Sequence, residues 1–351
     1  GEIRAEGGNV LLTARAVKGV VDNVINTSGI IAATSVSGSG GRIVLSGSSA
    51  GSVAISGTVD ASSAAGQGGL VMATGEHIAV ASTARIDASG RTGGGEIALG
   101  STGFTDAAQR FGNKATSVLV EAGSQLRSDA VESGRGGNIT MWSTDRTVFA
   151  GDLSARGGSQ GGDGGFAEVS SLKDIALTGN VDLRAPRGRS GLLLIDPTDL
   201  RITDAASGGS LDSNAADANV AAGDANAGSG ATLNTISRGR LESLAGTANI
   251  VLQATGQITV DAMAGNLINL ATTAGHGFTL QSTQTGGIRF ADAQTEIRTQ
   301  GGAITLEAQG IGSTLSNIGR LSTNGGAVTL QATGDISLAG NINAGSGAVH
   351  A

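Results

Sequence analysis

The sequence predicts an all-β fold, a right-handed parallel β-helix, and three observations support this prediction. A glycine-led unit recurs about every 27 residues, each repeat holds three short alternating segments, and the apolar residues are almost all aliphatic. In such a solenoid each repeat contacts only its neighbours, so no thick centre exists. We therefore expect three parallel sheets around a narrow core, with short helical insertions.

The composition argues against an ordinary globular core. Of the 351 residues 60 are glycine, and 39% are hydrophobic although only 2% are aromatic. Globular cores of this size normally use aromatic side chains, because each of them buries a large area. A core made of Ala, Val, Leu and Ile must be thin, which is the geometry of a solenoid.

The recurring unit is one or two glycines, a variable residue, and then an apolar, an unrestricted and an apolar residue. The first apolar position of the six copies is Ile43, Val71, Ile97, Ile139, Ala167 and Leu193. All but one of the steps between these positions are close to a period of about 27 residues, which we take as the length of one coil. The exception is the longer step from Ile97 to Ile139, which contains an insertion near residues 104–117. Stacking in parallel should align these six side chains in one inward-facing column.

Within a coil, three short segments alternate apolar and polar residues. In the coil that begins at Gly165 they are Phe166–Ser170, Asp174–Thr178 and Asn180–Ala185. Such alternation is typical of strands with one buried face. Three strands per coil, each stacked on its counterpart, predict three parallel sheets with coils ~4.8 Å apart.

The pattern divides the chain into two β-helix segments joined by a linker. We expect the first segment over residues 1–202, the linker over 203–247 and the second segment over 248–351. The linker is rich in Ala, Gly, Asp, Asn and Ser, and a short helix should follow from about Leu233 to Leu244. A further helix is expected near residues 14–26, where apolar residues recur at helical spacing.

The second segment has a less regular repeat. Ile250–Gly256 nearly matches Val328–Gly334, and the offset between them corresponds to three coils of about 26 residues. Between them lie similar units at Ile268, Ile288 and Ile304, at shorter spacings. We therefore expect coils of about 16–26 residues in this segment.

The charge and the absence of cysteine restrict the partners. The net charge is −7 and only three residues are lysine, so no basic stripe is available to neutralise phosphates and nucleic acid is not an expected partner. The chain has no cysteine, which excludes disulfides and thiolate metal sites. A chain without disulfide loops also suits passage through a narrow pore in unfolded form.

Several stretches resemble the filamentous haemagglutinin family of two-partner-secretion exoproteins, which are large bacterial adhesins. They are Gly8–Ala14, Val24–Ile31, Gly57–Ser62, Trp142-Ser143 ahead of Phe149–Gly151, Gly179–Pro186, Leu192–Leu200 and Gly301–Leu306. The run Gly179–Pro186 followed by the segment with Asp196-Pro197 is the most specific of these matches. The resemblance covers nearly the whole chain.

The resemblance implies a secreted or cell-surface rod, associated with the outer membrane and exported unfolded through a dedicated outer-membrane transporter. Proteins of this family serve as adhesins, as biofilm components or as stalks that deliver toxins. One feature departs from the family: its amino-terminal secretion domain contains Asn-Pro motifs, whereas the two prolines here follow Ala185 and Asp196. We expect that domain to lie outside this sequence, which would then be part of a longer protein.

Three patterns suggest chemistry, and for each a structural interpretation is favoured. Gly47–Gly51 matches a hydrolase nucleophile elbow, but that elbow needs a following helix and a partnered histidine. His77, His276 and His350 have no metal-ligand spacing. Gly157–Phe166 is similar to a calcium-binding nonapeptide, but Gln160 replaces its required Gly in one register and Phe166 its required Asp in the other, so we expect a glycine-rich turn.

The strongest candidate is an outward-facing column at the end of one strand of each coil. Its expected members, in coil order, are Asp60, Asp87, Arg127, Ser154 and Asp182. Paired carboxylates can divide the acid and base roles of sugar cleavage. The alternative is a solvated charge column beside a turn, where Asp is favoured anyway. We favour this structural interpretation.

These observations predict a structural or adhesive rod that is not an enzyme and uses no cofactor, metal or catalytic residue. Its expected partners are the outer-membrane transporter and glycans or proteins of host-cell or bacterial surfaces, with self-association as a further expectation. Two alternatives remain open: the stalk of a contact-dependent toxin-delivery exoprotein, and a polysaccharide-acting β-helical lyase or hydrolase.

Overall fold

The computed structural model of this chain is all-β, with parallel strands stacked as a β-solenoid of about ten turns, as expected of a right-handed parallel β-helix. It describes residues 1–14, 23–101, 115–207, 211, 234–271 and 274–351. The chain forms two compact units, which divide between Leu192 and Leu193 within strand β19 (Leu192–Asp196). The sequence placed the boundary in the linker at 203–247. In the structure the second unit begins earlier, so that it includes most of β19 and β20 (Leu200–Thr203).

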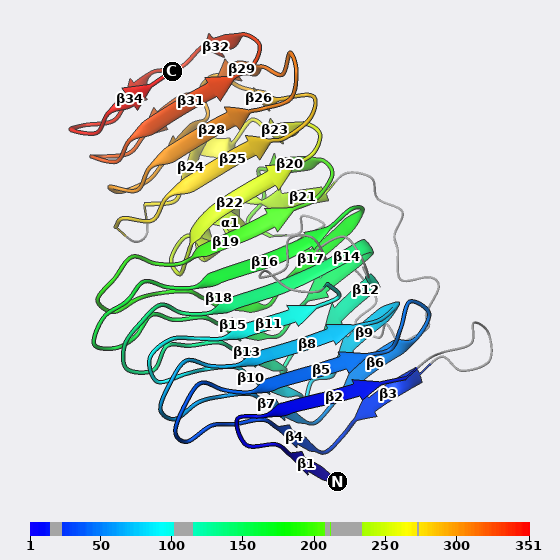
Figure 1. The fold of residues 1–351 in the computed structure, drawn as a ribbon. Helices are drawn as coiled ribbons and strands as arrows, with labels where there is room; N and C mark the ends of the chain where they lie inside the picture. Colours follow the sequence, from blue (N-terminus) through cyan, green and yellow to red (C-terminus); the bar gives the residue numbers. More distant parts are fainter. Residues whose placement is uncertain (15–22, 102–114, 208–210, 212–233, 272–273) are drawn as a thin grey trace. The chain divides into compact units, whose positions relative to one another are not determined.

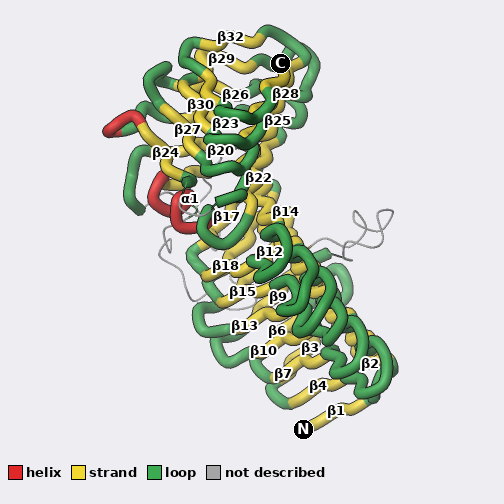
Figure 2. Tube along the Cα trace, turned by 90° about the vertical axis from the view of Figure 1, so that its left-hand side faces the viewer, coloured by secondary structure: helices red, strands yellow, loops and turns green. Residues whose placement is uncertain are grey.

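The strands of the first unit form three parallel stacks, as the sequence predicts, and two of the stacks are continuous through one long strand (Figures 1 and 2). We refer to the three stacks as sheets 1, 2 and 3. Sheet 1 contains β2 (Asn9–Thr13), β5 (Arg42–Ser46), β8 (Leu70–Thr74), β11 (Glu96–Leu99), the first part of β14 (Asn138–Phe149) and β16 (Phe166–Ser171). Sheet 2 contains β3 (Asn23–Thr27), β6 (Ser52–Ile55), β9 (His77–Val80), β12 (Ala115–Val120), the second part of β14 and β17 (Asp174–Leu177). Sheet 3 contains β1 (Glu2–Arg4), β4 (Ile30–Ala32), β7 (Thr58–Asp60), β10 (Arg85–Asp87), β13 (Gln125–Arg127), β15 (Asp152–Ser154) and β18 (Asn180–Asp182).

The core of this unit consists of stacked aliphatic columns. Ile43 pairs with Val71, Val71 with Ile97, Ile97 with Ile139, and Ile139 with Ala167, all of them fully buried. The predicted inward column is therefore confirmed within this unit. Burying each of the Val and Ile side chains contributes about 1.5–3 kcal/mol, and the smaller Ala167 contributes less.

Glycine is required where each coil after the first enters sheet 1. A Cβ atom added at Gly69 would lie 2.0 Å from the carbonyl oxygen of Gly41, one coil earlier, and one at Gly95 would lie 2.0 Å from that of Gly69. The same contact recurs at Gly137 and Gly165, at 2.1 Å. The glycine of the repeat is thus explained by the close stacking of coils.

The second unit also has three parallel sheets. Sheet 4 contains β22 (Asn249–Ala254), β25 (Phe278–Ser282), β28 (Ile304–Ala308), β31 (Val328–Ala332) and β34 (Val349–His350). Sheet 5 contains β21 (Asn234–Ser237), β20, β23 (Ile258–Val260), β26 (Ile288–Phe290), β29 (Leu315–Ile318) and β32 (Ile336–Leu338). Sheet 6 contains β24 (Leu267–Asn269), β27 (Glu296–Arg298), β30 (Arg320–Ser322) and β33 (Ile342–Asn343).

The coils of this unit are longer than the lower limit predicted from the sequence. Ile250, Phe278, Ile304, Val328 and Val349 are aligned, so successive coils shorten from about 28 to about 21 residues along the unit. The prediction of still shorter coils was wrong. It counted Ile288 of sheet 5 and Ile304 of sheet 4 as equivalent positions, although they lie on different sheets of the solenoid.

The helix predictions were right in part. Helix α1 (Arg238–Leu244) ends at the predicted residue, but the preceding residues from Asn234 form β21, which pairs with β20. Near residues 14–26, strand β3 begins at Asn23, so a helix there was wrong for 23–26, and residues 15–22 lie outside the described residues. A short 3₁₀ turn, η1 (Ala264–Asn266), was not predicted. Most of the insertion near 104–117 also lies outside the described residues, between β11 and β12.

Candidate functional site

The outward column of sheet 3 has the register that the sequence predicts. Asp60 pairs with Asp87 and Asp87 with Arg127. Arg127 pairs in turn with Ser154, and Ser154 with Asp182. These five positions therefore follow one another along the coils at intervals of one strand spacing, ~4.8 Å.

Each aspartate of this column caps the turn that follows its strand by accepting a hydrogen bond from a backbone N–H of that turn. Oδ1 of Asp60 accepts a hydrogen bond from the backbone N–H of Ser62, at 2.9 Å, and Oδ1 of Asp87 accepts one from Ser89, at 2.7 Å. Asp182 does the same for Arg184, at 3.2 Å. An Asp side chain bonded to the N–H two residues ahead is an Asx turn, a local structural device.

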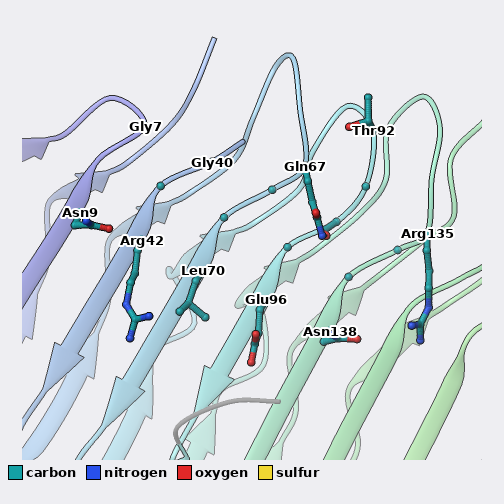
Figure 3. Close-up of a pocket in the computed structure, with 18 residues that line it drawn as sticks. Gly7, Asn9, Gly40, Arg42, Gln67, Leu70, Thr92, Glu96, Arg135 and Asn138 are labelled. Atoms are coloured by element: carbon teal, nitrogen blue, oxygen red, sulfur yellow. The ribbon is translucent and has the colours of Figure 1, made fainter. Parts of the chain in front are cut away.

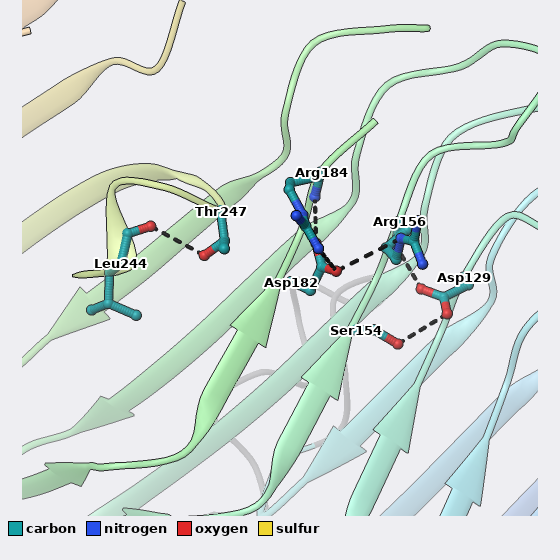
Figure 4. A network of polar contacts seen from close by, with 7 residues as sticks. All are labelled: Asp129, Ser154, Arg156, Asp182, Arg184, Leu244 and Thr247. Atoms are coloured by element: carbon teal, nitrogen blue, oxygen red, sulfur yellow. Dashed lines mark hydrogen bonds and ion pairs between the residues drawn. The ribbon is translucent and has the colours of Figure 1, made fainter. Parts of the chain in front are cut away.

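Where the column holds Ser154 instead of an aspartate, a neighbouring coil supplies the carboxylate (Figure 4). Asp129 accepts a hydrogen bond from the backbone N–H of Arg156, at 2.7 Å, and one from Oγ of Ser154, at 2.9 Å. Burial raises the pKa of Asp129, although the Arg156 N–H and the Ser154 hydroxyl oppose this shift. The turn after β15 thus receives the same type of cap from a different residue.

Asp182 lies in a more strongly cationic environment. Its carboxylate is bonded by both Nε and Nη2 of Arg184, at 2.8 and 2.7 Å, and Nε of Arg156 lies 3.7 Å away. Burial alone would raise the pKa of Asp182, but the hydrogen bonds and charge of Arg184 outweigh it and the pKa is lowered. This carboxylate is held in its charged form, as expected of an ion pair and not of a general acid.

A groove that is large enough for a ligand lies among the described residues of the first unit. It has a volume of about 650 Å³ and crosses sheet 1 where the strands begin (Figure 3). One side is formed by the first residues of five successive strands, Asn9, Arg42, Leu70, Glu96 and Asn138. The other side is formed by residues of the preceding turns, Gln67, Thr92 and Arg135. Paired glycines make the floor, and we refer to the whole as the glycine groove.

Sequence reasoning identified the glycines of this groove but not the groove itself. The glycines are part of the repeat unit. The residues that follow them occupy the variable position of that unit, and their types show no pattern along the sequence. Only the register brings Arg42, Glu96 and Asn138 to one side of a common channel. The remaining signal was the presence of charged residues directly after glycine pairs.

A second polar column, on sheet 2, was also missed. In register order its members are Ser52, His77, Ser117, Arg146 and Asp174. Nδ1 of His77 is hydrogen-bonded to Oγ of Ser117 at 2.8 Å, and Nε of Arg146 lies 3.3 Å from Oδ2 of Asp174. The side chains of this ion pair are only 6% and 9% exposed, and burial raises the pKa of Asp174 while the charge of Arg146 lowers it.

The other sequence candidates show structural contacts. Gly47–Gly51 is followed by β6 and not by a helix, so the geometry of a nucleophile elbow is absent there. In Gly157–Phe166 the acidic residue Asp163 accepts hydrogen bonds from the backbone and guanidinium of Arg189. His276 is buried and donates from Nδ1 to the carbonyl of Ala245, far from His77 in sequence, and His350 is exposed.

In the described part of the chain, no group of three or more His, Cys, Asp or Glu side chains is arranged to hold a metal ion. No helix there has the length and apolar character that a membrane span would need.

Compared with protein-family models and with curated proteins, the chain matches none.

Proposed function

We propose that this chain is the structural and adhesive shaft of a large, secreted or cell-surface bacterial exoprotein similar to the filamentous haemagglutinins. The observation that best supports the proposal is the use of polar side chains in the solenoid. The aspartates of sheet 3, which were the candidates for catalysis, each cap the turn that follows their own strand. A chain whose most regular acidic residues hold its turns in place is suited to a mechanical role.

The stacking gives such a shaft its stiffness. Inner strands of the sheets pair on both sides, as β8 pairs with β5 and β11. Each coil is thereby bonded to the next along three sheets, and local opening must break several backbone hydrogen bonds together. Resistance to proteases follows, because cleavage needs an extended and unpaired segment.

The partners are proposed on the resemblance and on the surface chemistry. The resemblance supports export through an outer-membrane transporter, and the absence of cysteine is compatible with passage in unfolded form. The adhesive role is supported by polar surfaces that present side chains at regular intervals, the glycine groove among them. Glycans or proteins on host-cell or bacterial surfaces are the proposed targets, and contacts within a biofilm are a related use.

The test is a binding screen with the purified chain. Beads coated with it should be retained on some host-cell or bacterial surfaces, whereas beads coated with a denatured sample should not. The same preparation is incubated with acidic polysaccharides, and unsaturated sugar products are followed by ultraviolet absorbance and new reducing ends by a reducing-sugar assay. Retention without product formation supports the adhesive role. Product formation would favour the polysaccharide lyase or hydrolase instead, and a lack of retention on every surface would contradict adhesion.

A further inference from the structure

We propose that the glycine groove binds a single extended chain of an acidic, linear glycan that lies along the solenoid axis. This inference deepens the proposed adhesive function and rests on it, because it names the ligand class of one surface. The groove lies between a strand side and a turn side that are polar except for Leu70, with the glycines only as the floor (Figure 3).

The dimensions of the groove favour a polymer over a small molecule. It extends from Asn9 to Asn138 across five coils, or four strand spacings, which is ~19 Å. Each coil contributes one strand-side residue at the same height, so the groove offers one contact position per coil, although the residue type differs from coil to coil. A linear polysaccharide presents hydroxyl and acidic groups at a comparable interval, roughly one sugar unit per coil.

The backbone of the floor excludes the main alternative polymer, an added peptide strand. Gly41, Gly69, Gly95 and Gly137 donate their N–H groups to carbonyls of this chain, at 2.7–2.8 Å. The glycines that precede them donate in the same way, at 2.8–3.0 Å. A peptide that extends a sheet needs free backbone donors and acceptors at an edge. This floor offers none of the donors, so recognition must come from the side chains of the walls.

Those side chains offer cationic and amide groups. No hydrogen bond or ion pair joins the side chain of Arg42, or that of Asn138, to any other described residue. Arg135 donates from Nε to the carbonyl of Gly164 at 3.3 Å, which leaves its terminal nitrogens available. Both arginines line the groove, and Glu96 between them is buried.

The charge balance favours an acidic ligand. Two arginines and one glutamate give the groove a net positive charge, although the whole chain has a net charge of −7. Guanidinium groups bind carboxylates by two parallel hydrogen bonds. Arg42 and Arg135 lie three coils apart, ~14 Å, so they would contact two separate acidic groups of one chain. Gln67, Thr92 and Asn138 would bond the hydroxyl groups between them.

The experiment measures binding of an oligogalacturonate long enough to span five coils, by titration calorimetry with the whole chain. The neutral control is a cello-oligosaccharide of the same length, and poly-glutamate tests for an acidic peptide. Arg42→Gln and Arg135→Gln should each weaken binding of the acidic oligosaccharide about fivefold, as for a solvent-accessible ion pair. Arg127→Gln is the matched control, since this exposed arginine lies on sheet 3 and should leave the affinity unchanged.

A second variant tests the shape of the groove without changing its charge. Gly93 lines the groove, and a Cβ atom added there would make ordinary contacts with the side chain of Gln67 and the carbonyl of Arg135, at 3.5 and 3.6 Å, so the backbone accepts a side chain at this position. Gly93→Leu should reduce binding at least as strongly as either arginine variant, with unchanged circular dichroism.

The outcomes separate the inference from the proposed function. Equal weakening by Arg127→Gln, equal binding of poly-glutamate, or full binding by Gly93→Leu would overturn the groove as a glycan site. If the groove variants lose the oligosaccharide but the coated beads still adhere, the glycan site stands and other surfaces carry adhesion. If the oligosaccharide binds but no cell surface retains the beads, the adhesive function fails while the groove remains a glycan site.

Discussion

The carboxylate of Asp129 lies in one coil and accepts a hydrogen bond from the backbone N–H of Arg156 in the next, at 2.7 Å (Figure 4). This contact replaces, across two coils, the local cap that Asp60 and Asp87 form within their own turns. The turn donor is therefore satisfied even where the column residue is Ser154. The cap from Asp129 and the local cap that Asp182 forms for Arg184 should differ in their response to pH, because the pKa of Asp129 is raised and that of Asp182 is lowered.

Asp129 should make the protein less stable as the pH rises. Burial raises the pKa of Asp129 above the ordinary value of 3.8. The contribution of Asp129 to the free energy of unfolding is therefore fully present below pH 3.8 and is lost as the pH rises through the folded-state pKa. Asp129→Asn keeps an acceptor for the Arg156 N–H and stays neutral. The variant should gain melting temperature relative to the wild type as the pH rises from about 3 to 7. Thermal unfolding by circular dichroism measures this difference.

Asp182→Asn serves as the opposite case. The pKa of Asp182 is lowered, so its contribution is present above the ordinary value of 3.8 and is lost as the pH falls through the folded-state pKa. This variant should be less stable than the wild type near neutral pH, with the difference shrinking in acid. A parallel response of the two variants would contradict the assignment of both carboxylates.

Coil stacking predicts a sharp contrast between two neighbouring glycines. Gly95→Ala places a Cβ atom 2.0 Å from the carbonyl oxygen of Gly69, so the coils must separate, at a cost of about 3 kcal/mol or more. At Gly93 the nearest atom would lie 3.5 Å away, and Gly93→Ala should change stability by less than about 1 kcal/mol. Denaturant unfolding of both variants measures the contrast. Similar stabilities would show that the coils can move apart at little cost.

The period of the repeat explains why so much of the first unit could be predicted. Two residues recur at fixed places in Gly69-Leu70-Val71 and Gly95-Glu96-Ile97. The first is a glycine, because a Cβ atom there would collide with a carbonyl oxygen of the previous coil. The second is an apolar residue, because its side chain faces the thin core. Both constraints are visible as a repeated sequence pattern, so the inward column and the register of its strands could be predicted. In the second unit all three sheets carry similar Ile-x-Leu or Ile-x-Phe units, such as Ile288–Phe290 and Ile304–Leu306. The sequence alone did not distinguish the sheets, and the coil length was underestimated.

The candidate sites were less predictable because they depend on positions that the repeat leaves free. The column from Asp60 to Asp182 was found because it follows a recognisable strand, and its role as a set of turn caps agrees with the favoured interpretation. The pair of Arg146 and Asp174 was not found. Arg146 lies in the twelve-residue strand β14, whose first part belongs to sheet 1 and whose second part belongs to sheet 2. Because no turn separates the two parts, the sequence does not show where the second part begins.

Removing one partner of the buried ion pair between Arg146 and Asp174 should destabilise the protein, whereas replacing both partners with apolar residues should cost little stability. Arg146→Met leaves the Asp174 carboxylate buried without its cation, which costs about 3–5 kcal/mol and should raise its pKa further. Arg146→Met combined with Asp174→Leu removes both charges and should recover most of that loss. A double-mutant cycle by chemical unfolding provides the measurement. Equal losses in the single and double variants would mean that other contacts of Arg146 dominate.

Asp60 and Asp87 provide the decisive comparison between a turn cap and a catalytic pair. Asp60→Ala removes the acceptor of the Ser62 N–H, and Asp87→Ala removes that of Ser89, so each should cost about 1 kcal/mol of stability. Asp60→Asn and Asp87→Asn keep the acceptor oxygen and should retain most of the stability. On acidic polysaccharides the wild type and all four variants should release neither unsaturated sugar nor new reducing ends. If the wild type forms product and Asp60→Asn, which still folds, does not, then one of these carboxylates acts as an acid or base and the column is a catalytic site.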